Sequence, residues 1–256
     1  MLCQTQIVWE DKKANMEKLK GLLALAEKQQ VSLVCLPEMS FTGFSMRTDI
    51  TMDRHKETIE QVSGLARQAH VAVAFGYVSP DALGQKAYNH YAVVDENGAL
   101  LADYVKIHPF SYGGEDQYFS GGDRLVSFSY QGFRIGLAVC YDLRFAEQFS
   151  SLAVICDLIL IGANWPAARR LHWQTLLRAR AIENQCYMAG VNCTGMMHDV
   201  EYQGDSMLIH PNGEIVEHGC CPAGESYTIC ALENDVAQYR RSFPVRQDRV
   251  EIQKEI

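Results

Sequence analysis

The stretch G-L-A-V-C-Y-D-L-R-F, from Gly136 to Phe145, does most to decide the fold of this chain. The apolar run Arg134–Val139 predicts a buried strand, and the polar residues after Cys140 lead into a helix expected over Phe145–Ile155. A tight turn from strand to helix exposes a nucleophile and directs the following backbone N–H groups at the same point. The stretch therefore predicts an α/β protein with a thiol at the end of a strand.

Three other apolar runs end on polar side chains. Glu38 ends L-V-C-L-P-E, Lys106 ends A-D-Y-V-K, and Asn164-Trp165 ends I-L-I-G-A-N-W. Strands that share a sheet place their ends on a common rim, where α/β sheets bind ligands. Each residue alone also fits an ordinary role, as a solvated acid, a surface lysine or a core cysteine. Together, an acid/base, a cation and a thiol favour catalysis.

Nucleophilic chemistry explains why these residue types belong together. A free thiol with a pKa near ~8.5 is only a few per cent ionised at neutral pH, which costs about 2 kcal/mol. Glu38 supplies a general base that removes this cost, and Lys106 supplies a cation. The backbone N–H of Tyr141 is placed to form half of an oxyanion hole. We therefore expect Cys140 to be the nucleophile.

Hydrophobic periodicity predicts the rest of the architecture. The remaining expected strands are Leu2–Val8, Ser32–Leu36, Val71–Val78, His90–Val94, Leu100–Val105, Leu158–Gly162, Tyr187–Cys193, Ser206–His210, Glu214–Glu217 and Ser226–Ala231. The remaining expected helices are Lys12–Gln29, Thr58–His70, Arg169–Asn184 and Leu232–Tyr239. Asn97-Gly98 and Asn212-Gly213 are hairpin signals, so the sheets should be mixed. No linker composition interrupts the chain, which favours one domain over residues 1–256.

Composition narrows the class of protein. The chain has 256 residues, a formal charge of −8, 48% hydrophobic and 21% charged residues, which is typical of a globular domain. These values exclude collagen-like, disordered and secreted disulfide-rich classes. The apolar runs are too short to cross a membrane, and a pI near 5.5 argues against a nucleic-acid partner. There is no secretory signal pattern, and we expect a cytoplasmic protein.

The nine cysteines contain no C-x-x-C pair, so we expect no metal site. Most lie in apolar stretches and are typical of packing residues in a reduced protein. A Cys–His dyad that uses His108 or His172 is a weaker alternative. A phosphate loop is weaker still, because Gly113-Gly114 and Gly121-Gly122 have no Lys-Ser/Thr after them.

These motifs resemble the nitrilase, or carbon–nitrogen hydrolase, superfamily. The matching residues are L-P-E at Glu38, Y-V-K-I-H-P at Lys106 and C-Y-D-L-R-F at Cys140, and the resemblance runs from Thr5-Gln6 to Phe243–Arg249. The block from Ala163 to Gln185 and Y-Q-G-D-S at Tyr202–Ser206 are similar to the omega-amidase branch.

The resemblance implies a Glu–Lys–Cys triad, a four-layer α-β-β-α sandwich of mixed sheets, and a homodimer. It also implies a second glutamate between Lys106 and Cys140. We assign this residue to Glu115, although Asp116 beside it makes the alignment ambiguous by one position. No cofactor is implied.

The omega-amidase likeness implies a small-molecule substrate that reacts with water, a dicarboxylic monoamide of the 2-oxoglutaramate or 2-oxosuccinamate type. Its distal carboxylate needs a cation, for which Arg144 and Arg169 are candidates. Arg144 equally fits a salt bridge with Asp142 or Glu183, and Arg169 a dimer contact. We expect Tyr141, Asn164 and Trp165 to wall the pocket. The alternatives are another amidase or carbamoyl-amide hydrolase of the same chemistry, and a non-catalytic binding module.

Overall fold

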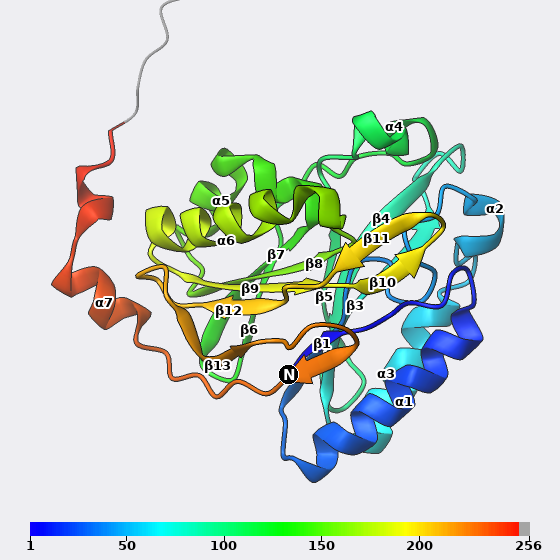
Figure 1. Ribbon diagram of the computed structural model, residues 1–256, viewed down its shortest axis with the longest axis horizontal. Coiled ribbons are helices and arrows are strands. Elements are labelled where there is room, and N and C mark those ends of the chain that lie inside the picture. The colour runs from blue at the N-terminus through cyan, green and yellow to red at the C-terminus, as the bar shows by residue number, and fades with distance from the viewer. Residues whose placement is uncertain (251–256) are drawn as a thin grey trace, which may run out of the picture.

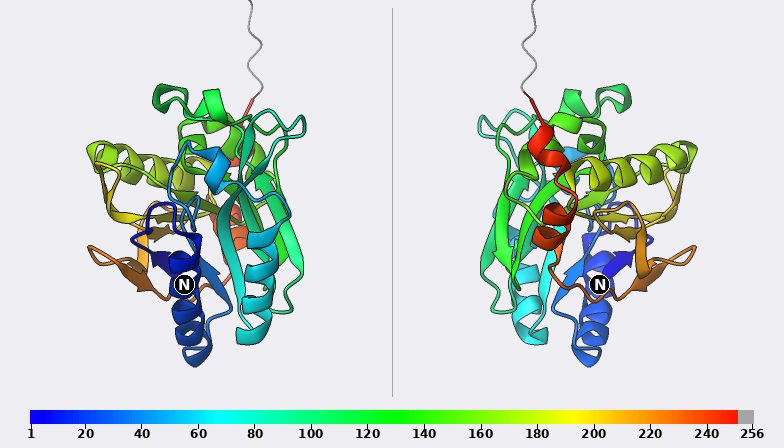
Figure 2. Two further views of the ribbon diagram at one scale, coloured as in Figure 1. Left: turned by 90° about the vertical axis from the view of Figure 1, so that its right-hand side faces the viewer. Right: turned by 90° about the vertical axis from the view of Figure 1, so that its left-hand side faces the viewer.

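The computed structural model describes residues 1–250, apart from the side chains of residues 217 and 218, and it consists of four layers (Figure 1). Two six-stranded sheets pack face to face, and helices cover the outer face of each sheet (Figures 1 and 2). The expected α-β-β-α sandwich of mixed sheets is therefore confirmed. Residues 251–256 of the expected domain lie outside the described residues.

The first sheet has the order β14-β1-β2-β3-β4-β5. Its strands are β1 (Leu2–Gln4), β2 (Leu33–Cys35), β3 (Ala72–Pro80), β4 (Ala87–Val94), β5 (Leu100–Val105) and β14 (Ser226–Thr228). Strands β1, β2 and β3 are parallel, whereas β4, β5 and β14 run antiparallel to their neighbours. Because two reversals separate β3 from β5, the ends of β2 and β5 lie on the same rim.

The second sheet has the order β13-β12-β9-β8-β7-β6. Its strands are β6 (Ser127–Tyr130), β7 (Phe133–Val139), β8 (Leu158–Ala163), β9 (Tyr187–Asn192), β12 (Met207–Ile209) and β13 (Ile215–Cys220). The central strands β7, β8 and β9 are parallel, and the outer pairings are antiparallel. A separate hairpin, β10 (Thr194–Met197) with β11 (Val200–Gln203), follows β9.

The helices are α1 (Lys12–Lys28), α2 (Thr48–Thr51), α3 (Glu57–Ala69), α4 (Glu115–Tyr118), α5 (Ala146–Leu152), α6 (Arg170–Asn184) and α7 (Val236–Ser242). The Asp11 side chain accepts a hydrogen bond from the Ala14 N–H at the start of α1, as expected of a helix cap. No helix within residues 1–250 combines the length and the apolar character that a membrane span requires.

The layers are held together by three hydrophobic clusters. Leu19 and Val62 of α1 and α3 pack against the first sheet. Tyr91 and Leu137 lie between the two sheets, and Trp173 of α6 packs against the outer face of the second sheet. Successive residues of a strand point to opposite faces, and both faces are buried here. This is why the strands appear in the sequence as nearly continuous apolar runs.

Both predicted hairpin turns are present. Asn97-Gly98 joins β4 to β5, and Asn212-Gly213 joins β12 to β13. The two glycines have φ values of +78° and +89°, which a residue without a Cβ adopts at little cost.

One hairpin, β10–β11, and one strand, β6, do not correspond to any expected element. The β10–β11 turn has positive φ at His198 and Asp199, so it lacks the Asn-Gly pattern that marks such turns. Strand β6 has the alternating sequence S-F-S-Y, in which only Phe128 is fully buried.

The first strand was predicted too long, over Leu2–Val8, because β1 ends at Gln4. The N–H groups of Gln6 and Val8 bond to the side chains of Glu225 and Asn15 instead of to a neighbouring strand. The apolar pattern continues past Gln4, but these side chains take the backbone donors out of the sheet.

Close contact between the two sheets gives a first test. A Cβ added to Gly162 in β8 would overlap the ring of Tyr91 in β4, whose hydroxyl is fixed by the Leu36 carbonyl at 2.6 Å. We expect Gly162→Ala to lower the free energy of unfolding by about 1–3 kcal/mol, measured by urea denaturation.

Gly21→Ala is the matched control, because nothing lies within 4 Å of a Cβ at this position in α1. It should raise stability by about 0.5–1 kcal/mol, since alanine favours a helix over glycine. Equal effects of the two substitutions would contradict the proposed packing between the sheets.

Candidate active site

The two sheets bring the predicted polar side chains to one rim. Glu38 lies shortly after β2, and Lys106 directly follows β5 of the same sheet. Cys140 directly follows β7 of the second sheet, and Asn164 follows β8. The site is therefore divided between the sheets, and its geometry depends on how they pack.

Lys106 lies at the centre of a buried charge cluster. Its Nζ donates to Glu38 Oε1 at 2.9 Å and to Glu115 Oε2 and Oε1 at 2.8 and 3.1 Å. All three side chains are at most 1% exposed. Transferring such charges out of water costs several kcal/mol per ion unless each one is paired and hydrogen-bonded. The close pairing of one cation with two carboxylates meets this requirement.

Two asparagines complete the cluster. Asn89 Nδ2 donates to Glu38 Oε1 at 2.8 Å and to Glu115 Oε1 at 3.0 Å, so it bridges the two carboxylates. The backbone N–H of Asn164 donates to Glu38 Oε2 at 2.9 Å, and its side chain donates to the Glu38 carbonyl at 2.7 Å. Glu38 is thus fixed from both sheets.

The backbone around Glu38 is fixed by a close approach to β3. A Cβ at Gly76 would overlap the Met39 N–H and the Glu38 backbone. Ser40 accepts a hydrogen bond from the Gly76 N–H at 2.8 Å and donates to the Pro37 carbonyl at 2.5 Å. Only glycine lets the chain carrying Glu38 lie this close to the sheet.

Cys140 has a strained backbone at the tip of its turn. Its φ is +42°, which is uncommon for a residue other than glycine and often marks a functional position. Burial raises the pKa of the Cys140 thiol well above its usual value, the Glu38 carboxylate raises it further, and Lys106 opposes the shift. The raised pKa keeps the thiol protonated at neutral pH, so the sulfur would become a nucleophile only if a base removed this proton.

The other members of the cluster are also shifted. Burial alone would lower the pKa of Lys106, but Glu115 and Glu38 outweigh burial and hold the pKa above its usual range. Lys106 therefore stays cationic at neutral pH. Burial raises the pKa of Glu115, and the neighbouring Lys106 opposes this shift.

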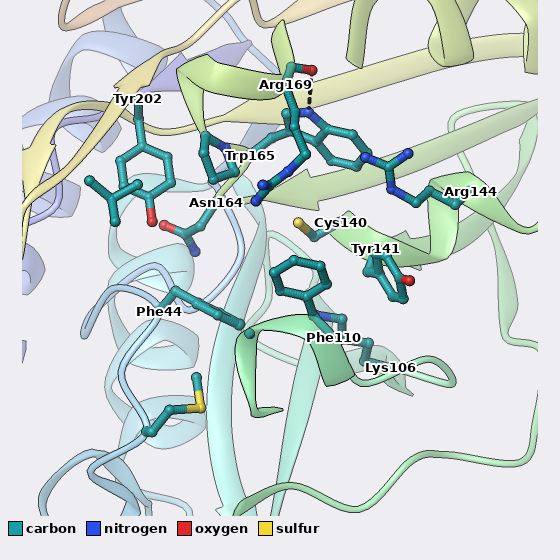
Figure 3. A pocket seen from close by; sticks show the side chains of 14 residues that line it. Phe44, Lys106, Phe110, Cys140, Tyr141, Arg144, Asn164, Trp165, Arg169 and Tyr202 are labelled. Carbon is teal, nitrogen blue, oxygen red and sulfur yellow. Dashed lines mark hydrogen bonds between the residues drawn. The ribbon is translucent and has the colours of Figure 1, made fainter. Parts of the chain in front are cut away.

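A pocket of about 270 Å³ opens beside Cys140 (Figure 3). Its walls are mainly aromatic and apolar, with Lys106, Asn164 and two arginines as polar groups. The lining residues outside the charge cluster are Phe44, Met46, Phe110, Gly113, Tyr141, Arg144, Trp165, Pro166, Arg169, Val200 and Tyr202. Pockets for drug-sized ligands hold roughly 300–1,000 Å³, so this one suits a small molecule.

The two pocket arginines rest on aromatic rings. Arg144 lies 4.9 Å from the centre of the Trp165 ring, and its Nη2 is 3.1 Å from His172 Nδ1. Arg169 lies 5.3 Å from the centre of the Phe110 ring. Within the described part of the chain, neither guanidinium forms an ion pair with a carboxylate. The pocket therefore presents two guanidinium groups to a ligand, in addition to the Lys106 ammonium.

The alternative roles considered for Arg144 are not observed. Asp142 binds Tyr104 and His108, and Glu183 pairs with Arg180 at 2.9 Å.

The adjacent acids Glu115 and Asp116, which both fitted the position of the second glutamate, lie in different environments. Glu115 is fully buried against Lys106, whereas Asp116 is exposed. His108, the alternative base, bonds to Asp142 and stacks on Phe145 with ring centres 3.7 Å apart.

Sequence reasoning did not identify Asn89 as part of the site. The expected strand began at His90, whereas β4 begins at Ala87, so Asn89 was left outside the sheet. A polar amide at an inward position of an apolar strand was the available signal. Tyr202 and Val200 were missed as pocket residues because the β10–β11 hairpin was not predicted.

Among residues 1–250, no group of three or more His, Cys, Asp and Glu side chains is placed to hold a metal ion.

Both the sequence and the fold of this chain are similar to those of known proteins. The carbon–nitrogen hydrolase family model matches residues 2–241. The chain is 34% identical to omega-amidase YafV of Escherichia coli K12, over 96% of this chain and 94% of that protein. It is 31% identical to 2-oxoglutaramate amidase of Bacillus subtilis, over 87% and 86% of the two chains.

A solved structure is also similar over almost its whole length. XC1258 from Xanthomonas campestris, described as a CN-hydrolase superfamily protein with an arsenic adduct in the active site, has a TM-score of 0.85 and 30% identity. The match covers 99% of this chain and 97% of that one. This chain therefore belongs to the carbon–nitrogen hydrolase family, within the nitrilase superfamily.

Proposed function

We propose that this protein is an omega-amidase, which hydrolyses the terminal amide of a small dicarboxylic monoamide to a carboxylic acid and ammonia. The observation that carries the proposal is one small pocket lined by a thiol, by the lysine of the buried Glu–Lys–Glu cluster and by two arginines that form no ion pair with a carboxylate among residues 1–250. Amides of the 2-oxoglutaramate and 2-oxosuccinamate type have the matching groups, and the activities named for the relatives support this substrate class.

The first half of the reaction acylates Cys140. Glu38 takes the thiol proton as the sulfur attacks the amide carbon. Lys106 and the Tyr141 N–H stabilise the negative charge that develops on the amide oxygen, and loss of one such donor typically costs about 2.7–4 kcal/mol. The C–N bond then breaks, the leaving nitrogen takes the proton that Glu38 received from the thiol, and ammonia departs. A thioester remains on Cys140.

The second half releases the acid. Glu38 removes a proton from water, and the resulting hydroxide attacks the thioester carbon. The C–S bond breaks, the carboxylic acid leaves, and the thiol of Cys140 regains its proton. Water is the only co-reactant.

Glu115 acts on this reaction through Lys106. Its carboxylate contacts the ammonium at 2.8 Å and shares Asn89 with Glu38. It therefore orients Lys106 towards the amide oxygen and keeps the lysine charged. Without Glu115, the Lys106 ammonium would keep only one of the two carboxylates described here, that of Glu38, to neutralise its charge.

Arg169 is the group we assign to the distal carboxylate of the substrate. Arg144 is already held by His172 and the Trp165 ring, whereas the Arg169 guanidinium contacts only the Phe110 ring among residues 1–250. Figure 3 shows the Arg169 side chain directed towards Cys140, while the Trp165 indole donates to the Arg169 carbonyl at 2.8 Å. Tyr141, Asn164 and Trp165 wall the site between these groups.

We further propose that the chain acts as one catalytic domain, pairs into a homodimer and works in the cytoplasm. The family resemblance supports the dimer. The buried, free cysteines of the described residues, such as Cys3 and Cys156, are compatible with a reducing compartment.

An amide panel tests the substrate class. Ammonia release should be fastest from 2-oxoglutaramate or 2-oxosuccinamate, slower from neutral amides such as butanamide, and absent from nitriles and N-carbamoyl compounds. Arg169→Gln should lower kcat/KM for the anionic amides by about 10- to 150-fold, which corresponds to a charged hydrogen bond of about 1.5–3 kcal/mol. It should leave butanamide hydrolysis nearly unchanged.

Two controls accompany the panel. Arg124→Gln removes an arginine that is 86% exposed and should leave every rate unchanged. Cys140→Ser should abolish ammonia release from all substrates. Faster hydrolysis of N-carbamoyl compounds or of neutral amides would contradict the omega-amidase assignment and support another amidase or a carbamoyl-amide hydrolase.

Alkylation tests whether Cys140 is protonated at rest. Because burial and Glu38 raise the thiol pKa, its reaction with iodoacetamide should accelerate about tenfold per pH unit and reach no plateau up to about pH 9. In Glu38→Gln, which removes one of the raising groups, the profile should shift to lower pH. Peptide mass spectrometry measures the modification at Cys140. A plateau below about pH 7 in the unmodified enzyme would instead indicate a preformed thiolate.

A further inference from the structure

A buried carboxylate other than Glu38 and Glu115 lies close to Cys140 in the sequence. Asp142 stands two residues after Cys140, is fully buried, and does not line the pocket. Its two oxygens accept four hydrogen bonds: Oδ2 from the Tyr104 hydroxyl at 2.7 Å and the Val139 N–H at 2.9 Å, and Oδ1 from the His108 N–H at 3.1 Å and His108 Nδ1 at 2.8 Å. The mechanism proposed above for Glu38, Lys106 and Cys140 assigns no step to the Asp142 carboxylate.

The donors to Asp142 come from both sides of the site. Val139 directly precedes Cys140 and ends β7 of the second sheet. Tyr104 and His108 lie on either side of Lys106, in and after β5 of the first sheet. One carboxylate therefore holds the segment that carries the nucleophile against the segment that carries the cation.

Tyr104 makes this connection rigid. Its hydroxyl donates to Asp142 and accepts from the Ile107 N–H at 3.1 Å and from Gln148 Nε2 at 2.9 Å. The Ile107 N–H belongs to the residue that directly follows Lys106. The backbone is thus fixed immediately after the lysine by the tyrosine that precedes it.

The turn at Cys140 needs such support. The residue has a φ of +42°, and strained conformations of this kind persist only where their surroundings hold them. The bond from the Val139 N–H to Asp142 closes the turn around Cys140, and the same carboxylate anchors the first sheet. A small shift between the sheets would change the distance from the thiol to Lys106.

We propose that Asp142 is a positioning residue that sets the placement of Cys140 relative to Lys106. The proposal rests on the proposed function, in which these two residues act on the same amide. Asp142 touches neither the reacting atoms nor the substrate pocket. Its effect should therefore appear in the chemical step more than in substrate binding.

The test compares Asp142→Asn with Asp103→Asn. Asparagine keeps the size of Asp142 but turns an NH₂ group towards two of its donors. Asp103 is a matched control in β5, because it also accepts from a tyrosine and a histidine, Tyr77 and His90, each at 2.8 Å. Asp103→Asn should leave kcat unchanged, whatever its effect on stability.

For Asp142→Asn we expect kcat to fall by about 10- to 100-fold, since misplacement by about 1 Å costs up to this much, while KM changes less than about threefold. The alkylation rate of Cys140 at one pH should fall in parallel. A folded Asp142→Asn enzyme with the kcat and the alkylation rate of the parent would overturn the proposal. So would an equal loss in Asp103→Asn.

If Asp142→Asn does not fold, Tyr104→Phe tests the same positioning role of Asp142. It removes one donor and should lower kcat several-fold without a matching rise in KM; an unchanged kcat would overturn the proposal. The alkylation rate separates this proposal from the proposed function, because it needs no substrate. If the parent enzyme hydrolyses no amide, a slower alkylation in Asp142→Asn still supports the positioning role, and an unchanged rate rejects it.

Discussion

The buried ammonium of Lys106 is the group on which the rest of the site depends. A cation that is 1% exposed is tolerated only beside compensating charge, and Glu38 and Glu115 provide it at 2.9 and 2.8 Å. This requirement brings together the end of β2, the end of β5 and the helix that begins at Glu115. The two glutamates keep the lysine charged, whereas burial, reinforced by Glu38 and opposed by Lys106, holds the pKa of the Cys140 thiol well above its usual value. The cluster thus fixes both the geometry and the protonation of the site.

The second constraint is the division of the site between two sheets. The proposed base, Glu38, and the cation Lys106 follow strands of the first sheet, and the proposed nucleophile, Cys140, follows a strand of the second. Apolar packing brings the sheets together but does not specify the position of individual polar atoms. The hydrogen bonds from Asn164 to Glu38 and from Tyr104 to Asp142 specify these positions, because each bond joins polar groups of opposite sheets.

Much of this arrangement could be predicted from the sequence, for a physical reason. Strands buried on both faces are continuous apolar runs, so the polar residues that end them, Glu38, Lys106 and Cys140, stand out. Asn89 could not be recognised in the same way, because its place in the site depends on hydrogen bonds to Glu38 and Glu115, which are distant from it in the sequence. The hairpin that carries Tyr202 lacked a glycine signal at its turn, where His198 has positive φ. Pairings that depend on tertiary structure leave little local pattern.

The proposed mechanism passes through a thioester at Cys140, and rapid acid quench followed by peptide mass spectrometry tests this most directly. During turnover of 2-oxoglutaramate, the peptide that contains Cys140 should gain the mass of the acyl group. Added hydroxylamine should remove the adduct and yield the corresponding hydroxamate. Continued release of ammonia with no acyl group on Cys140 and no hydroxamate would contradict the account.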